Sequence, residues 1–359
     1  MAYQDIPAKV LSRLSHRREN PLNSMIPISN PPKPIEANLR NRASSLGILD
    51  RLPLELPHEV LRDLDFQSAI RFSRVSAQGR NVLYHFPAYR DVIKHAPHAL
   101  AALSQTKLLH LHSASKLHNA LRAERCATCP EYGAYLFLPT CERCCWPCLY
   151  YKPTRQVVPR TFAAKIFALS PKMVQQLPVM FSVPGPYGST RKGTYKSRRL
   201  FSVSAAKELV ISIYGSAGNA KEAILRKRSN RQTLDEARYL QAIFSDYTCL
   251  DSLMATDEQI ERVDLYFGMA SIPFPSLTPP GIVEHGLWCK GCEWTWGQDI
   301  GRDRLPAYVI SSIVPTNCHP GRVLYGMMNR AYSRIGFFAH IRHCYGAQQL
   351  LAGPGVQEG

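Results

Sequence analysis

The sequence predicts a mainly α-helical protein with a few short β-hairpins, and three observations lead to this fold class. Apolar residues recur every three or four positions through most segments after Ile48, as on one face of an amphipathic helix. Alternating apolar and polar residues, the pattern of a half-buried strand, are confined to short runs such as PVMFSV and RLFSVS. The chain has 359 residues, 45% of them hydrophobic, so it contains enough apolar material for a substantial core.

The composition predicts the cellular location of the chain and the class of its partners. No run approaches the roughly 20 apolar residues that a membrane helix needs, and the first residues lack the apolar region of a secretory signal. We therefore expect no membrane partner and a location in the cytoplasm or nucleus, where structural disulfides are rare. The formal net charge of +17 and the isoelectric point near 9.5 favour acidic partners, either nucleic acid or acidic proteins.

The two ends of the chain are predicted to be flexible. Residues 1–46 contain several prolines, including the run NPPKP, which favours an extended polyproline-like chain and opposes helix and sheet. We expect this Pro-rich N-terminal segment to be disordered. Residues 352–359 are expected to form a flexible tail.

Residues 47–97 are predicted to form a compact block of three short helices. Asp50 or a neighbour can cap the first helix, and Pro53 suits a first helical position. The runs DFQSAIRFSRVS and NVLYHF continue as a second and a third helix, with Ala69, Ile70 and Val75 pointing inward. Such a small core is marginal alone, so the block is expected to lean on a partner or on the rest of the chain.

Residues 98–351 are predicted to be an α-rich region with short hairpins. The run HALAALSQTKLLHLHSASKLHNALRAE gives one or two helices, and TFAAKIFALSPKMVQQL gives two, the second capped by Ser170. PVMFSV and RLFSVS are expected to pair as a hairpin near 179–203, joined by the basic run 191–199. SAAKELVISIYG and TLDEARYLQAIFSDY predict further helices, and AYSRIGFFAHIRHCYGAQQLL predicts one closing helix.

Six of the eleven cysteines lie within one stretch, CATCPEYGAYLFLPTCERCCWPC. It contains three CxxC pairs, namely Cys126 and Cys129, Cys141 and Cys144, and Cys145 and Cys148. Two such pairs a short loop apart can complete a tetrahedron of thiolates, the pattern of a structural Zn²⁺ site. The spacing leaves open which second pair binds. A redox CxxC in CWPC, or plain buried thiols, are the alternative interpretations.

A second candidate zinc site begins at Cys289 and Cys292 in the run WCKGC. His340 and Cys344 are four residues apart, so on one helix both would face the same ion. The remaining rival ligands are Cys318, His319 and His343. The alternative interpretation is a buried CxxC beside a histidine that only packs.

The block from Ile48 to about Pro97 resembles an F-box. The residues that carry the resemblance are LPLELPHEVLRDLDFQSAIRFSRVSAQGRNVL, whereas Pro57 and Gly79 depart from the pattern. The cysteine-rich stretch, AAKIFALSPKMVQQLPVMFSVPGPY and RAYSRIGFFAHIRHCYGAQQL extend the likeness over roughly residues 48–351. Together they are similar to cysteine-bearing F-box proteins common in filamentous fungi.

The resemblance implies a substrate receptor of an SCF-type ubiquitin ligase. Residues 47–97 would bind the Skp-type adaptor, and residues 98–351 would recruit an unknown protein substrate for ubiquitination. Carried over by position, the adaptor-facing residues are Leu52, Pro53, Val60, Leu61, Leu64 and Ile70. The family has no catalytic residue of its own.

Other functions are kept as alternatives. A zinc-dependent nucleic-acid-binding protein is suggested by the net charge and by RKGTYKSRR, although the basic residues are spread over most segments and no known DNA-reading zinc spacing is present. A scaffold without a ligase role is the other alternative. No nucleophile–base spacing or carboxylate pair indicates an enzyme.

Overall fold

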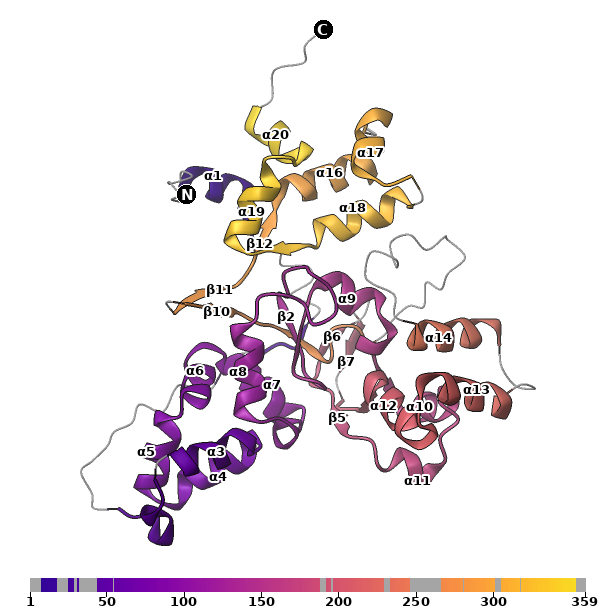
Figure 1. Cartoon of the computed structure of the whole chain (residues 1–359). Helices are drawn as coiled ribbons and strands as arrows, with labels where there is room; N and C mark the ends of the chain where they lie inside the picture. Colours follow the sequence, from indigo (N-terminus) through magenta and orange to yellow (C-terminus); the bar gives the residue numbers. More distant parts are fainter. Residues whose placement is uncertain are drawn as a thin grey trace.

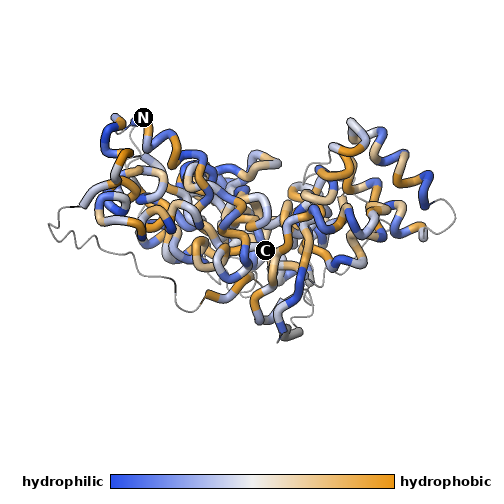
Figure 2. The backbone as a smooth tube through the Cα atoms, turned by 90° about the horizontal axis from the view of Figure 1, so that it is seen from below, coloured by the Kyte–Doolittle hydropathy of each residue, from blue (hydrophilic) through white to orange (hydrophobic). Residues whose placement is uncertain are grey.

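The computed structural model is mostly helical, as the sequence predicts, and its elements gather into three bodies (Figure 1). The structure describes residues 8–17, 25–28, 31, 44–53, 55–187, 192–194, 196–228, 233–245, 266–279, 281–300, 305–316 and 318–352. Hydrophobic and hydrophilic residues alternate along much of the tube, as expected of amphipathic elements (Figure 2). Within the described ranges, no helix has both the length and the apolar character needed to span a membrane.

The first body is a helical arm (Figure 1). It contains η1 (Gly47–Arg51), α3 (Glu55–Asp63), α4 (Phe66–Val75), α5 (Ala77–His85), α6 (Pro87–His95), α7 (Pro97–Gln105), η2 (Leu109–Leu111) and α8 (Ala114–Arg122). Asp65, Ser76 and Ser113 begin three of these helices by accepting hydrogen bonds from free N–H groups of the first turn. Pro57 lies in the first turn of α3, where no intrahelical bond needs its missing N–H, so it does not interrupt the helix.

A small antiparallel sheet joins this arm to the cysteine-rich stretch. Strand β2 (Tyr135–Phe137) lies between β3 (Glu142–Cys144) and β9 (Ser271–Pro273), and all of β2 is buried. Helix α9 (Trp146–Tyr151) and η3 (Pro153–Arg155) follow β3. One buried core contains Leu61 and Phe66 of the arm together with β2. The helical arm therefore packs against the rest of the chain, as its small size predicts.

The second body is built on a sheet whose two faces are both covered. Strand β8 (Arg199–Ser202) lies between β4 (Val157–Pro159) and β5 (Val179–Phe181), which confirms the predicted hairpin pairing near 179–203. Val158 and Phe201 face the core of this body, whereas Met180 and Leu200 face the core of the first body. The alternation of side chains along a strand thus joins the two cores through one sheet.

Short helices cover the second body. They are α10 (Arg160–Ile166), α11 (Pro171–Val174), α12 (Val203–Tyr214), α13 (Ala217–Arg228) and α14 (Leu234–Phe244), with the strand pair β6 (Gly185–Tyr187) and β7 (Lys192–Thr194) beside them. Ser170 caps α11 by accepting a hydrogen bond from Met173 N–H, as predicted. The buried side chain of Arg228 pairs with Glu236 across α13 and α14, with Nη2 to Oε2 at 2.5 Å.

The third body contains the C-terminal elements and, unexpectedly, the start of the chain (Figure 1). Its elements are β12 (Leu287–Cys289), α16 (Lys290–Ile300), α17 (Ala307–Ile313), α18 (Pro320–Met328), β13 (Ala331–Tyr332), α19 (Arg334–Ile341) and α20 (Tyr345–Ala352). The preceding strand pair, β10 (Ser276–Thr278) and β11 (Ile282–Glu284), packs against α8 and the core of the first body. Strand β12 pairs with β13 on one side and with the N-terminal β1 (Ser15–His16) on the other.

Three expectations about the chain are corrected. Residues 1–46 are not disordered throughout, because Ala8–Leu14 forms α1 and because Leu14, Met25 and Ile26 are buried in cores. The expectation rested on prolines and missed the apolar contacts of Leu14 in the third body and of Met25 and Ile26 in the core of the first body. The predicted closing helix is two helices, since α19 ends at Ile341 and α20 begins at Tyr345. Val75, expected inward, is 78% exposed at the end of α4. Residues 353–359 of the expected flexible tail lie outside the described residues.

Candidate metal centres

Four cysteines of the clustered stretch converge on one point. Their ligand atoms all lie within 4.8 Å of one another, and the four are Cys126, Cys129, Cys145 and Cys148. The first pair lies on the loop after α8, where Cys126 N–H donates to the carbonyl of Glu131 at 2.8 Å. The second pair lies at the start of α9, where Cys145 occupies the N-cap position. A loop and a helix start therefore supply two ligands each.

The sulfur spacing matches a tetrahedral metal–thiolate site. Cys129 Sγ lies 3.5 Å from Cys145 Sγ and 3.6 Å from Cys148 Sγ. Metal–sulfur bonds of about 2.3 Å in a tetrahedron place the sulfurs about 3.8 Å apart. A disulfide needs about 2.05 Å, and all ten cysteines in the described ranges are free thiols. The geometry therefore fits a metal ion and not a crosslink.

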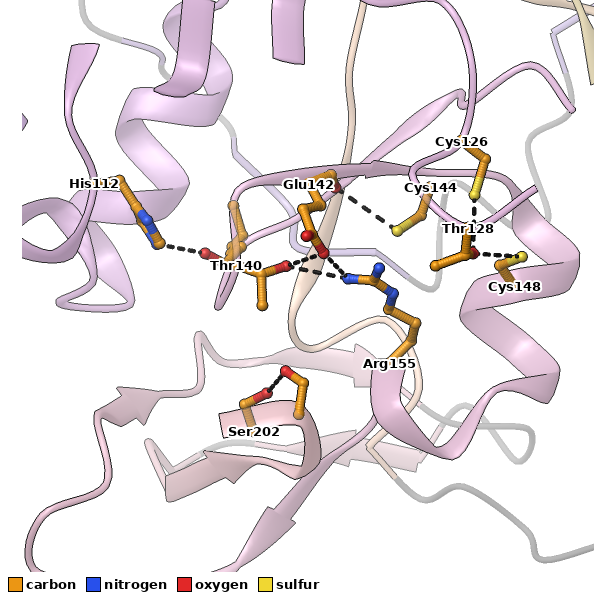
Figure 3. Close-up of polar contacts among 11 residues, drawn as sticks. His112, Cys126, Thr128, Thr140, Glu142, Cys144, Cys148, Arg155 and Ser202 are labelled. Atoms are coloured by element: carbon orange, nitrogen blue, oxygen red, sulfur yellow. Dashed lines mark hydrogen bonds and ion pairs between the residues drawn. The ribbon is translucent and has the colours of Figure 1, made fainter. Parts of the chain in front are cut away.

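Electrostatics within the cluster favour at least one thiolate. The pKa of Cys126 lies far below that of an ordinary thiol, because the Cys129 sulfur and then its other sulfur neighbours donate to it. Thr128 adds support, since its Oγ1 lies 3.4 Å from Cys126 Sγ and donates to Cys148 Sγ at 3.1 Å (Figure 3). A thiolate is the form in which cysteine binds a metal ion.

The tertiary structure selects between the two overlapping CxxC pairs. Cys141 and Cys144, both predicted as candidate ligands, are not members of the four-cysteine group. Cys141 lies in the turn before β3, and Cys144 Sγ on β3 points toward the carbonyl of Glu142 at 3.7 Å (Figure 3). Burial raises the pKa of both thiols, so they remain protonated. These two residues act as packing cysteines, which corrects the prediction for them.

Arg143 fixes the segment between the two CxxC pairs of the first cluster. The side chain is 2% exposed and donates to four backbone carbonyls, those of Ala120 at 3.0 Å, Phe274 at 3.2 Å, Gly133 and Pro275. A Cβ on Gly133 would lie 2.2 Å from Arg143 Cγ, so this position must lack a side chain. Burial lowers the pKa of Arg143 to about 10, and the guanidinium stays charged near neutral pH.

A second buried arginine fixes the other side of β3. Arg155 Nη1 pairs with the carboxylate of Glu142 and donates to Thr140 Oγ1 at 3.1 Å (Figure 3). Its guanidinium also lies over the ring of Phe137, 5.5 Å from the centroid. Neither arginine is predicted as part of the site. Their only signal in the sequence is their position, one within the cysteine-rich stretch and one shortly after it.

The second cluster has three cysteines and one histidine. The ligand atoms of Cys289, Cys292, His340 and Cys344 all lie within 4.8 Å of one another. Cys344 Sγ is 3.8 Å from the sulfurs of both Cys289 and Cys292, and Cys292 Sγ is 3.2 Å from His340 Nε2. The predicted set therefore converges. The two residues do not share one helix as predicted, because His340 lies in the last turn of α19 whereas Cys344 immediately precedes α20.

Tyr332 orients the histidine of this second cluster. The two rings stack with centroids 4.4 Å apart at 15°, and Tyr332 Oη lies 3.2 Å from His340 Nδ1. An Nδ1–H that donates to this oxygen leaves the Nε2 lone pair free to bind a metal ion. Burial raises the pKa of Tyr332, and the nearby Cys292 sulfur adds to this effect, so the phenol stays neutral. The tyrosine was not predicted as part of the site.

The rival ligands lie outside both clusters. Among the described residues, Cys318, His319 and His343 belong to neither group. Cys318 packs against a small core with Val314 and Leu324. His343 is exposed at the rim of a cavity beside the second cluster.

The residues predicted to face an adaptor divide into exposed and buried members. Leu52 is 43% exposed and Val60 is 62% exposed, and Pro53 is also exposed. Leu64 and Ile70 are half-buried against the core. Leu61 is only 2% exposed, so its prediction as a contact residue is wrong: its position on α3 turns it into the core.

Four further apolar side chains on η1, α3 and α4 are exposed and were not predicted as contacts. They are Ile48 at 76%, Leu49 at 40%, Leu56 at 49% and Val75 at 78%. A helical-spacing pattern places one face inward but does not show that the opposite face is also apolar. Together with Leu52 and Val60 they are called the arm patch below.

Comparisons with family models, with curated proteins and with solved structures gave no significant match to this chain.

Proposed function

We propose that this chain is an F-box substrate receptor of an SCF-type ubiquitin ligase, held together by two structural zinc ions. The observation that carries the receptor proposal is the arm patch on η1, α3 and α4. Apolar side chains exposed in this number on one short helical arm are typical of a surface that a protein partner covers. The resemblance of the same residues to an F-box names the Skp-type adaptor as that partner.

The arm itself supports docking at this surface. Its inner face belongs to the main core through Leu61, Phe66 and Ala69, so the outer face is presented on a fixed scaffold. Each exposed aliphatic side chain that a partner covers contributes about 25 cal/mol per Å² of apolar area. Residues 98–351 would then recruit an unknown protein substrate.

A binding measurement with the purified Skp-type adaptor tests the receptor proposal. Val60→Asp places a charge in the arm patch without touching the core, because Val60 is 62% exposed. We expect adaptor affinity to fall at least about tenfold, the usual effect of losing a central apolar contact. Ile282→Asp is the matched control, since Ile282 is 56% exposed on β11, outside the helical arm. Equal affinities for the two variants and the parent would contradict the proposal.

The ligand sets support zinc at both clusters. Soft thiolate and imidazole ligands in a four-coordinate tetrahedral arrangement favour Zn²⁺. Each cluster offers four such ligands and no carboxylate, which is the closed ligand set of a structural site and differs from the open set of a catalytic one. We expect native mass spectrometry to find two zinc ions per chain. A chain that purifies with no zinc, and whose melting is unchanged by a chelator, would refute the zinc proposal.

Nucleic-acid binding remains the second candidate. Lys196, Arg198 and Arg199 are exposed in and before β8, in the basic run between the paired strands. Substituting all three by Ala should weaken retention on a nucleic-acid column. If these residues contact phosphates, retention of the parent chain should fall steeply with added salt. Retention that this triple substitution leaves unchanged would remove the candidate.

A further inference from the structure

The first residues that the structure describes pack beside the second cluster, called the Cys3His cluster below. Leu14 is fully buried in a small core that contains three of the four ligands, Cys289, Cys292 and Cys344. In the β1–β12 ladder, Ser15 pairs with Cys289. The segment Ala8–His16, called the N-terminal strap below, therefore shares its packing with the metal ligands.

Polar contacts hold the strap on both sides of that core. Lys290 Nζ donates to the carbonyl of Ser12 at 3.2 Å, and Arg13 Nη2 donates to the carbonyl of Leu350 at 2.5 Å. His16 Nε2 lies 3.1 Å from a carboxylate oxygen of Glu293 on α16. The residues that contact the strap lie on α16 and α20. The ligand Cys292 lies in the first turn of α16, and the ligand Cys344 directly precedes α20.

The Cys3His cluster is also open to small molecules. A cavity of about 250 Å³ reaches three of its four ligands, Cys292, His340 and Cys344. Cys289 does not line this cavity. The other lining residues are Thr295, Ser312, Ile313, Met327, His343 and Tyr345. The cavity is large enough for a solute the size of hydrogen peroxide, and two of the cysteines that line it, Cys292 and Cys344, have sulfurs 3.8 Å apart.

We propose that Cys292 and Cys344 form a site of oxidative modification that releases the N-terminal strap. This inference rests on metal binding at the Cys3His cluster and is independent of the adaptor. In the reaction the two thiolates are oxidised to one disulfide, and their two electrons reduce hydrogen peroxide. With two protons from solvent, the peroxide becomes two waters, and the metal ion leaves because only Cys289 and His340 remain to hold it.

Loss of the ion undocks the strap because both depend on the same small core. The two sulfurs must close from 3.8 Å to about 2.05 Å to form the bond, which displaces the side chains on which Leu14 packs. Without the ion, Cys289 no longer holds the end of β12, the strand with which the strap pairs. Linkage is reciprocal, so a strap that docks poorly must in turn weaken metal binding.

Graded hydrogen peroxide on the full-length, metal-loaded chain tests this inference. Native mass spectrometry counts metal ions, peptide mapping identifies the disulfide, and hydrogen exchange follows amides 8–16. We expect one metal ion to leave first, a Cys292–Cys344 disulfide to appear with it, and exchange of the strap amides to rise by about tenfold or more. A reductant with added zinc should restore all three readouts.

Variants separate coupling from general unfolding. Leu14→Ala leaves every ligand in place and should raise strap exchange without peroxide while also speeding metal loss to peroxide. Ile335→Ala, at a side chain that is 60% exposed on α19, is the control and should behave as the parent chain.

Three results would overturn the inference. A different pair oxidising first would exclude the modification site, and a Cys292–Cys344 disulfide that leaves strap exchange unchanged would exclude the coupling. In both cases, the zinc proposal remains supported if the chain carries two metal ions before peroxide is added. A starting chain without metal would instead remove the zinc proposal and this inference together.

Discussion

Gly346→Ala is predicted to pull apart the two helices that carry the Cys3His cluster. Gly346 on α20 lies against α16, and a Cβ at this position would meet the carbonyl oxygen of Gly291 at 2.0 Å and Thr295 Oγ1 at 2.5 Å. The first contact is with backbone, which cannot turn aside as a side chain can. The added methyl group therefore forces the helices themselves to separate.

The required separation follows from the distances. Ordinary Cβ contacts begin at 3.4 Å, so relief of the 2.0 Å contact needs about 1.4 Å of movement between α16 and α20. Cys292 lies on α16, and Cys344 directly precedes α20. Metal–ligand distances tolerate only about 0.2 Å of deviation. Overpacking of this kind costs about 1–3 kcal/mol of folding free energy, and loss of the metal ion adds to that cost.

Metal content and thermal unfolding of the purified variant measure the effect. We expect Gly346→Ala to hold one metal ion where the parent holds two, and to unfold at a lower temperature. Gly297→Ala is the matched control in α16, because a Cβ there would meet nothing within 4 Å. This control should keep both ions and gain up to about 1 kcal/mol, since Ala is the better helix former. A Gly346→Ala chain that keeps both ions and melts as the parent does would refute this reasoning.

Three further outcomes are predicted from other parts of the structure. Cys145→Ser should remove one metal ion by native mass spectrometry, whereas Cys141→Ser should keep both; loss with either would show that the selected pair is wrong. Burial lowers the pKa of His112 to about 4. Because the unfolded chain binds this proton more readily, the free energy of unfolding should fall by up to about 3 kcal/mol as pH drops from about 6.5 toward 4. His112→Gln should flatten this fall in denaturant titrations. Glu236→Ala leaves a buried arginine unpaired and should cost about 3–5 kcal/mol, against at most about 0.5 kcal/mol for Glu222→Ala in an exposed pair; similar costs for the two would contradict the burial argument.

Local patterns in the sequence were enough to predict most of the helices and the ligand chemistry. Helix starts such as Ser170 and the pairing of PVMFSV with RLFSVS depend on neighbouring residues and on alternation, both of which can be read along the chain. A CxxC pair likewise brings its two sulfurs together within one turn of chain. For this reason the sequence could predict that both cysteine regions contain residues able to converge on one metal ion.

The choice among overlapping cysteine pairs required the tertiary structure. Cys141–Cys144 and Cys145–Cys148 have the same spacing, and only the path of β3 into α9 decides which pair points at Cys126. The same holds for Arg143, whose four carbonyl acceptors come from residues 120 to 275 and leave no pattern along the chain.

The sequence alone determined which residue types could bind a metal ion and which segments are amphipathic, because the spacing of residues along the chain is a local property. Tertiary structure decided what each face covers, because burial depends on segments far apart in the chain. Leu61 and Val60 are adjacent, yet one lies in the core and the other in the arm patch. The N-terminal strap pairs with a strand more than 270 residues away, and the prolines that follow it gave no sign of that contact.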